Sequence, residues 1–161
     1  MPGKEMLLQL LDYHEWANEK LFDCAAKLPP EQLDAPTGYG YDTLRQTLFH
    51  ILRADFGWWR AFNTADVPPP RLEDYPTVED LRRLARQQGA LARQTIEALD
   101  EDTLARPRQV KWSGGGESSL VTWQMLVQPL IHAVHHRAEA AQILTSFGQP
   151  PGDFDFIDYV Q

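Results

Sequence analysis

The chain has 161 residues, of which 43% are hydrophobic and 24% charged, and its formal net charge at pH 7 is −8. This composition is typical of a globular protein and excludes a disordered or fibrous chain. The acidic balance also argues against nucleic-acid binding and against docking on an anionic membrane, because both need a cationic surface.

The sequence also restricts the location and the redox chemistry of the protein. It contains no apolar run long enough to cross a bilayer and no basic-then-apolar leader at its N-terminus. We therefore expect a cytoplasmic protein with no membrane partner. Cys24 is the only cysteine, which excludes an internal disulfide and a metal cage built from thiolates. At this length, residues 1–161 are expected to form a single domain.

Long amphipathic helices are predicted in the first part of the chain. The first covers about 4–28, where apolar residues recur every three or four positions without Gly or Pro. The second follows a turn-rich stretch and covers about 43–63. A proline-rich loop separates it from the third helix, which begins at Thr77, a favourable N-cap residue. The apolar face of this third helix ends near Leu99.

The last long helix is predicted over about 122–147, with Gly148 as its stop signal. Before it, residues 103–119 lack a helical period, and a short strand over 109–112 is the one regular element considered there. Four helices of this length predict an all-α four-helix bundle, with a long irregular connection before the last helix.

Two histidines on the last helix are the first candidates for metal ligands. His132 and His136 are four positions apart, so their rings project from one face of the helix and can bind one ion. His50, beside the apolar stripe of the second helix, is the best third ligand. Three histidines leave coordination positions open, as catalytic zinc sites do. The alternative is that they are surface or buried structural histidines, because spacing alone is a weak signal.

Other polar residues have two interpretations each. Asp55 interrupts the apolar stripe of the second helix and could orient a ligand histidine or form an ion pair between helices. Glu139, one turn after His136, could be a general base, a partner of that ligand or a member of a salt bridge. His14 lies on an apolar stripe and is interpreted as a buried, hydrogen-bonded structural residue, whereas His135 lies off the face of the predicted ligand pair.

Three segments, taken in order along the chain, resemble the DinB/YfiT-like superfamily of metal-binding four-helix bundles. Residues 13–21 read YHEWANEKL and are similar to the family's opening Y-x-x-W-A-N motif. Residues 44–59 are similar to the family segment that carries a histidine on the second helix, with Asp55 where Glu is common. Residues 132–139 read HAVHHRAE and are similar to the motif H-x-x-x-H-R-G-Q, with Ala-Glu in place of Gly-Gln.

The resemblance implies a fold, a ligand set and an oligomeric state. The fold would be a DinB/YfiT-like four-helix bundle over residues 1–161. A divalent metal ion would be bound by His50, His132 and His136. Imidazole ligands suit Zn, Ni or Fe, so the ligand set leaves the metal open. The resemblance also implies a homodimer.

For function, the resemblance implies a metal-dependent thiol S-transferase. The metal would activate a low-molecular-weight thiol, which acts as a cofactor and attacks a small-molecule electrophile. Asp55, Arg137 and Glu139 would support the site, with no catalytic role assigned to them. Two alternatives stay open: a hydrolase that uses metal-bound hydroxide, and a non-enzymatic, stress-related metal-binding bundle. Whether the protein is an enzyme is therefore open at this point.

Overall fold

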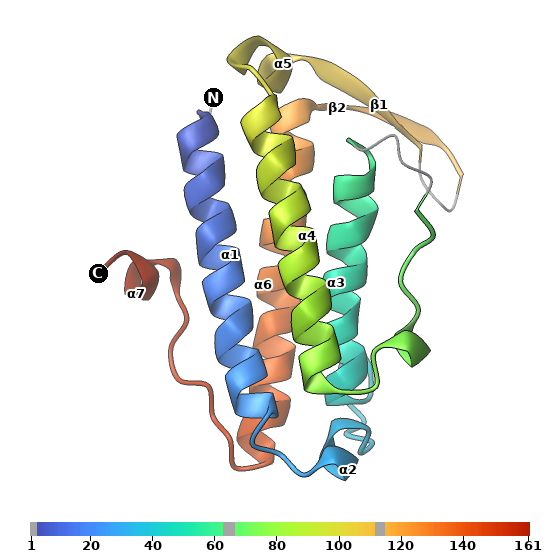
Figure 1. Cartoon of the computed structure of the whole chain (residues 1–161), viewed down its shortest axis with the longest axis vertical. Coiled ribbons are helices and arrows are strands. Elements are labelled where there is room, and N and C mark those ends of the chain that lie inside the picture. The colour runs from blue at the N-terminus through green and yellow to red at the C-terminus, as the bar shows by residue number, and fades with distance from the viewer. Residues whose placement is uncertain (1–2, 63–66, 112–114) are drawn as a thin grey trace.

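The computed structural model describes residues 3–62, 67–111 and 115–161, and it confirms the predicted all-α bundle (Figure 1). The four long helices are α1 (Lys4–Ala25), α3 (Leu44–Arg60), α4 (Val78–Ala98) and α6 (Thr122–Ser146). Their limits agree with the predicted ones to within a few residues, although the predicted end at residue 63 lies outside the described residues. Among the helices in these ranges, none has the length and apolar character needed to cross a bilayer.

Side-chain caps explain where two of the long helices begin. The hydroxyl of Thr77 accepts a hydrogen bond from the Asp80 amide at 3.2 Å, and the Asp80 carboxylate accepts one from the Thr77 amide at 3.1 Å. The Thr43 hydroxyl accepts a bond from the Gln46 amide at 3.2 Å. These contacts satisfy amides that have no partner in the first turn of a helix, so α4 and α3 begin at defined residues.

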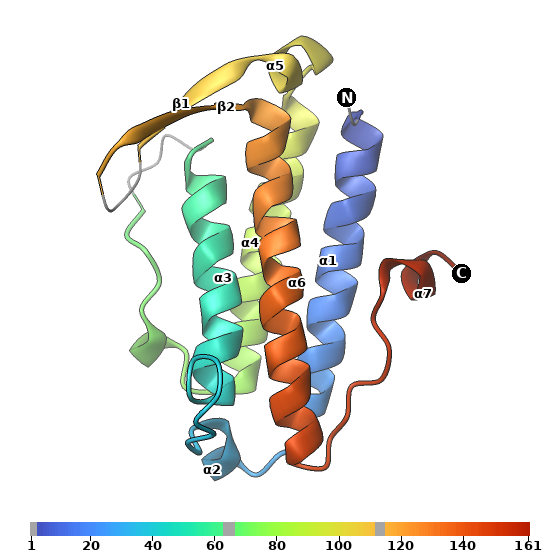
Figure 2. The same cartoon turned by 180° about the vertical axis from the view of Figure 1, so that it is seen from behind.

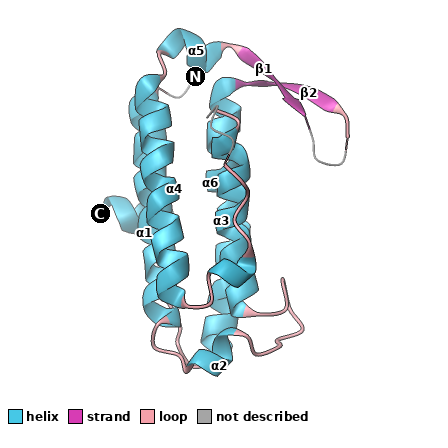
Figure 3. Ribbon diagram, turned by 45° about the vertical axis from the view of Figure 1, so that its right-hand side comes forward, coloured by secondary structure: helices cyan, strands magenta, loops and turns pink. Residues whose placement is uncertain are grey.

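The connections contain short elements that the prediction mostly missed. They are α2 (Pro30–Leu33), the 3-10 helix η1 (Leu72–Asp74), α5 (Glu101–Ala105), β1 (Pro107–Lys111), β2 (Glu117–Val121) and α7 (Phe156–Val160). Residues 103–119 were expected to be irregular except for a strand at 109–112, but β1 and β2 form an antiparallel hairpin (Figure 3). Part of that predicted strand, residue 112, lies outside the described residues. Five-residue elements are too short to show a period, and a hairpin exists only through pairing.

The long helices are arranged in the order α1, α4, α3, α6 around the bundle (Figures 1 and 2). Helices α1 and α6 run in one direction, and α3 and α4 run in the other. Because α3 and α4 are parallel neighbours, the chain has to return between them, and the described residues 67–77 run back along the outside of the bundle. The antiparallel seams are therefore α1/α4 on one side and α3/α6 on the other.

A polar layer divides the core of the bundle into two apolar clusters. One cluster includes Leu7, Leu11, Trp59, Ala92, Ile96 and Leu126. The other includes Leu21, Leu48, Leu52, Leu81, Ala140 and Leu144. Between them lie five buried polar residues, which we call the polar layer: His14, Asn18, Asp55, Gln88 and Arg137. Every long helix contributes to this layer, at the position where its apolar stripe passes from one cluster to the other.

The C-terminal tail packs against α1. The Tyr13 hydroxyl donates a hydrogen bond to the Phe154 carbonyl at 2.9 Å. The Tyr13 ring meets the Phe156 ring edge-on, with centroids 5.4 Å apart, and Trp16 lies 5.7 Å from Tyr159. Aromatic contacts of this kind explain why the tail follows the bundle instead of extending from it (Figure 1).

Candidate metal centre

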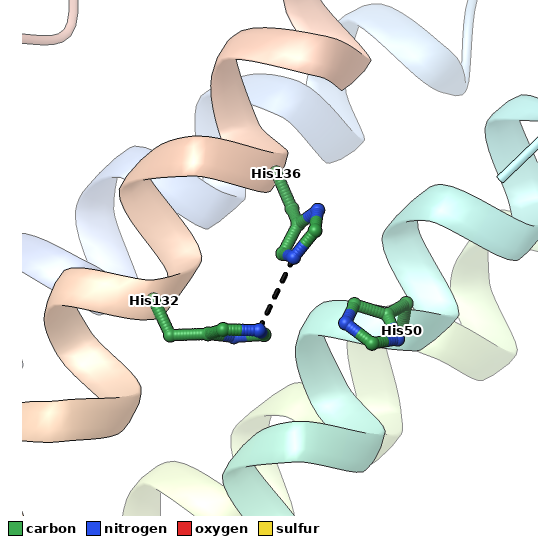
Figure 4. A group of neighbouring side chains, drawn as sticks. All are labelled: His50, His132 and His136. Atoms are coloured by element: carbon green, nitrogen blue, oxygen red, sulfur yellow. Dashed lines mark hydrogen bonds between the residues drawn. The ribbon is translucent and has the colours of Figure 1, made fainter. Parts of the chain in front are cut away.

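The structure brings the three predicted ligand histidines together across the α3/α6 seam (Figure 4). His50 comes from α3, and His132 and His136 come from α6. One nitrogen of each ring lies within 4.8 Å of the others, and all three side chains are partly buried. The three histidines are therefore positioned to hold a metal ion.

The spacing of the α6 pair fits a shared ion. The Nε2 atoms of His132 and His136 are 3.2 Å apart, as the dashed line in Figure 4 marks. Two nitrogens that each lie about 2.0–2.1 Å from one tetrahedral zinc ion are separated by about 3.3–3.4 Å. The α6 histidine pair therefore already has nearly the nitrogen spacing that such an ion requires.

Two of the histidines, His50 and His132, are in the protonation state that metal binding needs. Burial, followed by the nearby rings of His136 and His132, lowers the pKa of His50 from 6.5 to about 4. Burial and the charge of His136 likewise lower the pKa of His132. Both rings are consequently neutral at pH 7, and a neutral imidazole has a lone pair to give to a metal.

Glu139 orients one of the ligands. Its Oε2 atom accepts a hydrogen bond from His136 Nδ1 at 2.7 Å. This bond fixes the tautomer of His136 so that the lone pair of Nε2 faces His132. Of the contacts considered from the sequence, the structure shows the one between Glu139 and His136.

Tyr41 is a part of the site that sequence reasoning missed. Its hydroxyl is hydrogen-bonded to His50 Nε2 at 3.0 Å, and the two rings stack with centroids 3.9 Å apart. Burial, and then the charge of Glu139, raises the pKa of Tyr41, so its hydroxyl keeps its proton. The preceding residue, Gly40, has a φ of 56°. A Cβ atom added at this position would lie 3.3 Å from Glu139. The only signal in the sequence was a turn-rich stretch before the second helix.

Comparisons with known proteins agree with this architecture. The model of the DinB family matches residues 1–161. The chain belongs to the DinB family. It is 19% identical to the protein DinB of Bacillus subtilis (strain 168) over 158 residues, which covers 94% of this chain and 92% of that protein. A crystal structure of a conserved protein from Enterococcus faecalis matches with a TM-score of 0.61 at 15% identity, covering 89% of this chain and 96% of that one. At that identity, the structural likeness shows a shared fold.

In this DinB-family chain, Asp55 and Arg137 contact His14 instead of the three clustered histidines. His14 Nε2 donates a hydrogen bond to Asp55 Oδ2 at 3.0 Å, and Arg137 Nη1 donates one to His14 Nδ1 at 3.0 Å. The same guanidinium nitrogen donates a hydrogen bond to the side-chain oxygen Oδ1 of Asn18 at 3.4 Å. Asp55 therefore takes the helix-interface role, and Arg137 lies in the polar layer. His14 is buried and hydrogen-bonded, as its position predicted.

His135 is separated from the site, although it neighbours a ligand in sequence. Its side chain is exposed, while that of His136 is partly buried. Successive residues of a helix point about 100° apart, so only one of the two can face α3. This difference makes His135 a natural control for experiments on the metal centre.

We expect Asp55→Asn to destabilise the fold and to leave metal binding intact. The substitution removes the carboxylate that balances the buried Arg137 through His14, which costs about 3–5 kcal/mol of unfolding free energy. Urea denaturation measures this loss, and elemental analysis of the folded fraction measures the metal. The control is Asp34→Asn, which breaks an exposed pair with Arg45 and should cost no more than about 1 kcal/mol. Loss of metal without loss of stability would contradict this assignment.

Proposed function

We propose that the protein binds one divalent transition metal ion through His50, His132 and His136, and that it is a metal-dependent thiol S-transferase. The observation that supports this proposal is a cluster of three imidazoles, with no acidic side chain among the potential ligands of the described residues, in which burial lowers the pKa of His50 and His132. An ion held by neutral ligands alone keeps its full positive charge. When bound, it would stabilise the thiolate form of a low-molecular-weight thiol.

The residues around the histidines would prepare the site for this chemistry. Glu139 holds the His136 ring in place, and Tyr41 lies against the His50 ring with a hydroxyl that stays protonated. That hydroxyl can donate a hydrogen bond to an anionic group bound beside His50. In the transfer, the thiol loses its S–H proton and a new S–C bond forms. The leaving group departs with the electron pair of the broken bond.

A cavity along the same side of α3 offers room for the thiol or the electrophile. It has a volume of about 780 Å³ and is lined by α3, α6 and β1. Its α3 residues include Ala54 and Gly57, which follow His50 by four and seven positions and so share its face of the helix. The rise of an α-helix places them about 6–10 Å from His50 along the axis. Arg108 and Lys111 of β1 also line the cavity, and Lys111 is paired with Glu117 at 3.4 Å. The charge of Arg108 favours a ligand that carries a carboxylate group.

The alternatives have less support from this arrangement. A hydrolase would need a free general base, and Glu139, the acid considered for that role, is hydrogen-bonded to His136. A structural metal site is normally closed by a fourth protein ligand. Within the part of the chain that the structure describes, the cluster of potential ligands contains three histidines and no fourth group. The open position favours a site that binds a small molecule.

We expect the purified protein, produced without an affinity tag, to hold about one metal ion per chain. His132→Ala should lose this metal because two ligands hold a transition metal poorly. His135→Ala should retain it, since that exposed ring lies off the face of the ligand pair. Elemental analysis of the three proteins measures the difference. Equal metal content in both variants would contradict the ligand assignment.

The thiol proposal is tested on the cobalt-substituted protein. Titration with small thiols should produce a thiolate-to-cobalt charge-transfer absorption that saturates, because the thiol binds the ion as a thiolate. His132→Ala should show no such band, and His135→Ala should behave as wild type. Cobalt binding without a thiol-dependent band would overturn the transferase proposal and leave the metal site itself intact.

We expect Glu139 to contribute to metal affinity through its hydrogen bond to His136. Glu139→Leu removes the acceptor and should weaken metal binding about 10- to 100-fold. Glu139→Gln keeps a carbonyl acceptor and should weaken it less. Competition with a chromophoric chelator measures both affinities. If the two variants bind metal equally well, the hydrogen bond does not orient the ligand.

A further inference from the structure

A second cavity lies in the α1/α4 seam, whereas the three histidines lie across the α3/α6 seam on the other side of the bundle. Its volume is about 540 Å³, within the range of roughly 300–1,000 Å³ that is usual for small-molecule sites. Helices α1, α3 and α4 line it, and it extends inward to His14 and Asp55 of the polar layer. None of the three clustered histidines lines this cavity, so a ligand bound in it would be independent of the proposed function.

The inner wall of the cavity carries polar atoms that have no hydrogen-bond partner. Gln88 is only 6% exposed, and neither its Nε2 nor its Oε1 atom is hydrogen-bonded to any described residue. Asp55 is 3% exposed, and its Oδ1 atom likewise has no hydrogen-bond partner among the described residues. Native proteins pair nearly all buried groups of this kind with protein, water or ligand. A buried primary amide that lines a cavity is therefore available to a ligand.

Apolar side chains form most of the remaining inner wall. Leu11 and Phe22 come from α1, and Leu52 and Trp59 come from α3. All four are at least nine-tenths buried. An apolar ring would be sheltered among these residues while its polar edge reached Gln88.

The charges at the rim of the cavity are already paired with one another. Arg93 forms ion pairs with Asp12 and Glu15, and Arg86 donates a hydrogen bond to Glu19 at 3.2 Å. These five residues line the cavity, and each of the two cations is held by a carboxylate. A charged ligand would have to compete with these pairs, whereas a neutral ligand would leave them unchanged.

We propose that the α1/α4 cavity binds a small neutral molecule that has an apolar ring and an adjacent N–H donor and C=O acceptor, as in a lactam. The carboxamide of Gln88 presents a donor and an acceptor side by side, and a lactam presents the complementary pair. Two hydrogen bonds then form at once, and the ring covers the apolar wall. We infer a lactam because its amide group complements the buried carboxamide of Gln88.

The test uses 2-pyridone as the probe and ¹H–¹⁵N NMR of the full chain as purified. The side-chain NH₂ signals of Gln88 are identified by their absence from the spectrum of Gln88→Leu. These signals should shift with 2-pyridone concentration and saturate. Binding to Gln88→Leu should be weaker by about tenfold or more, because both hydrogen bonds are lost. The matched control is Gln87→Leu, at the exposed neighbouring position, which should bind as wild type.

A second probe keeps the test independent of whether a variant folds. N-methyl-2-pyridone has the same ring but no N–H donor, so it should bind wild-type protein about tenfold more weakly than 2-pyridone. Gln88→Leu should not distinguish the two probes, and thermal melting checks that it is folded. The proposal is overturned if the Gln88 signals do not shift, if the two probes bind wild type equally, or if Gln88→Leu binds 2-pyridone as tightly as wild type.

Discussion

The guanidinium of Arg137 has no exposed surface, and the arrangement of the helices depends on how its charge is balanced. Arg137 on α6 donates a hydrogen bond to His14 on α1, and His14 donates one to Asp55 on α3. Apolar contacts are non-directional and tolerate sliding, whereas these bonds form at only one relative height of the helices. We infer that this chain of contacts sets the register of α1, α3 and α6, while the two apolar clusters provide most of the stabilisation.

The same register places the three clustered histidines. His136 directly precedes Arg137, and His50 precedes Asp55 by five positions, so each helix carries a core residue and a ligand close together. Neighbouring positions on a helix face different directions, which sends Arg137 into the core and His136 toward α3. When α3 and α6 are aligned by the buried polar contacts, His50 lies opposite the α6 pair. The same alignment of α3 and α6 thus positions both the buried polar contacts and the partly exposed histidine cluster.

The polar layer also separates two regions with different chemistry. On the α3/α6 side, three imidazoles meet, and a cavity that includes Arg108 in its lining lies along the same side of α3. On the α1/α4 side, the same layer presents an unpartnered amide to a cavity whose rim charges are paired. The first arrangement favours a metal ion and anionic ligands, and the second favours a neutral one.

Local pattern in the sequence was sufficient for the four long helices and for the α6 histidine pair, because helical period and i, i+4 spacing are properties of one segment. The resemblance to the DinB family, carried by three separate motifs, correctly indicated the family. Tyr41, the β1–β2 hairpin and the unpartnered amide of Gln88 were not predictable. Each depends on which segments meet in space: a loop folding over α6, two short strands pairing, and a cavity opening beside α4. The contact of Asp55 with His14 instead of a clustered histidine likewise depends on the relative alignment of the helices. The sequence alone does not specify that alignment.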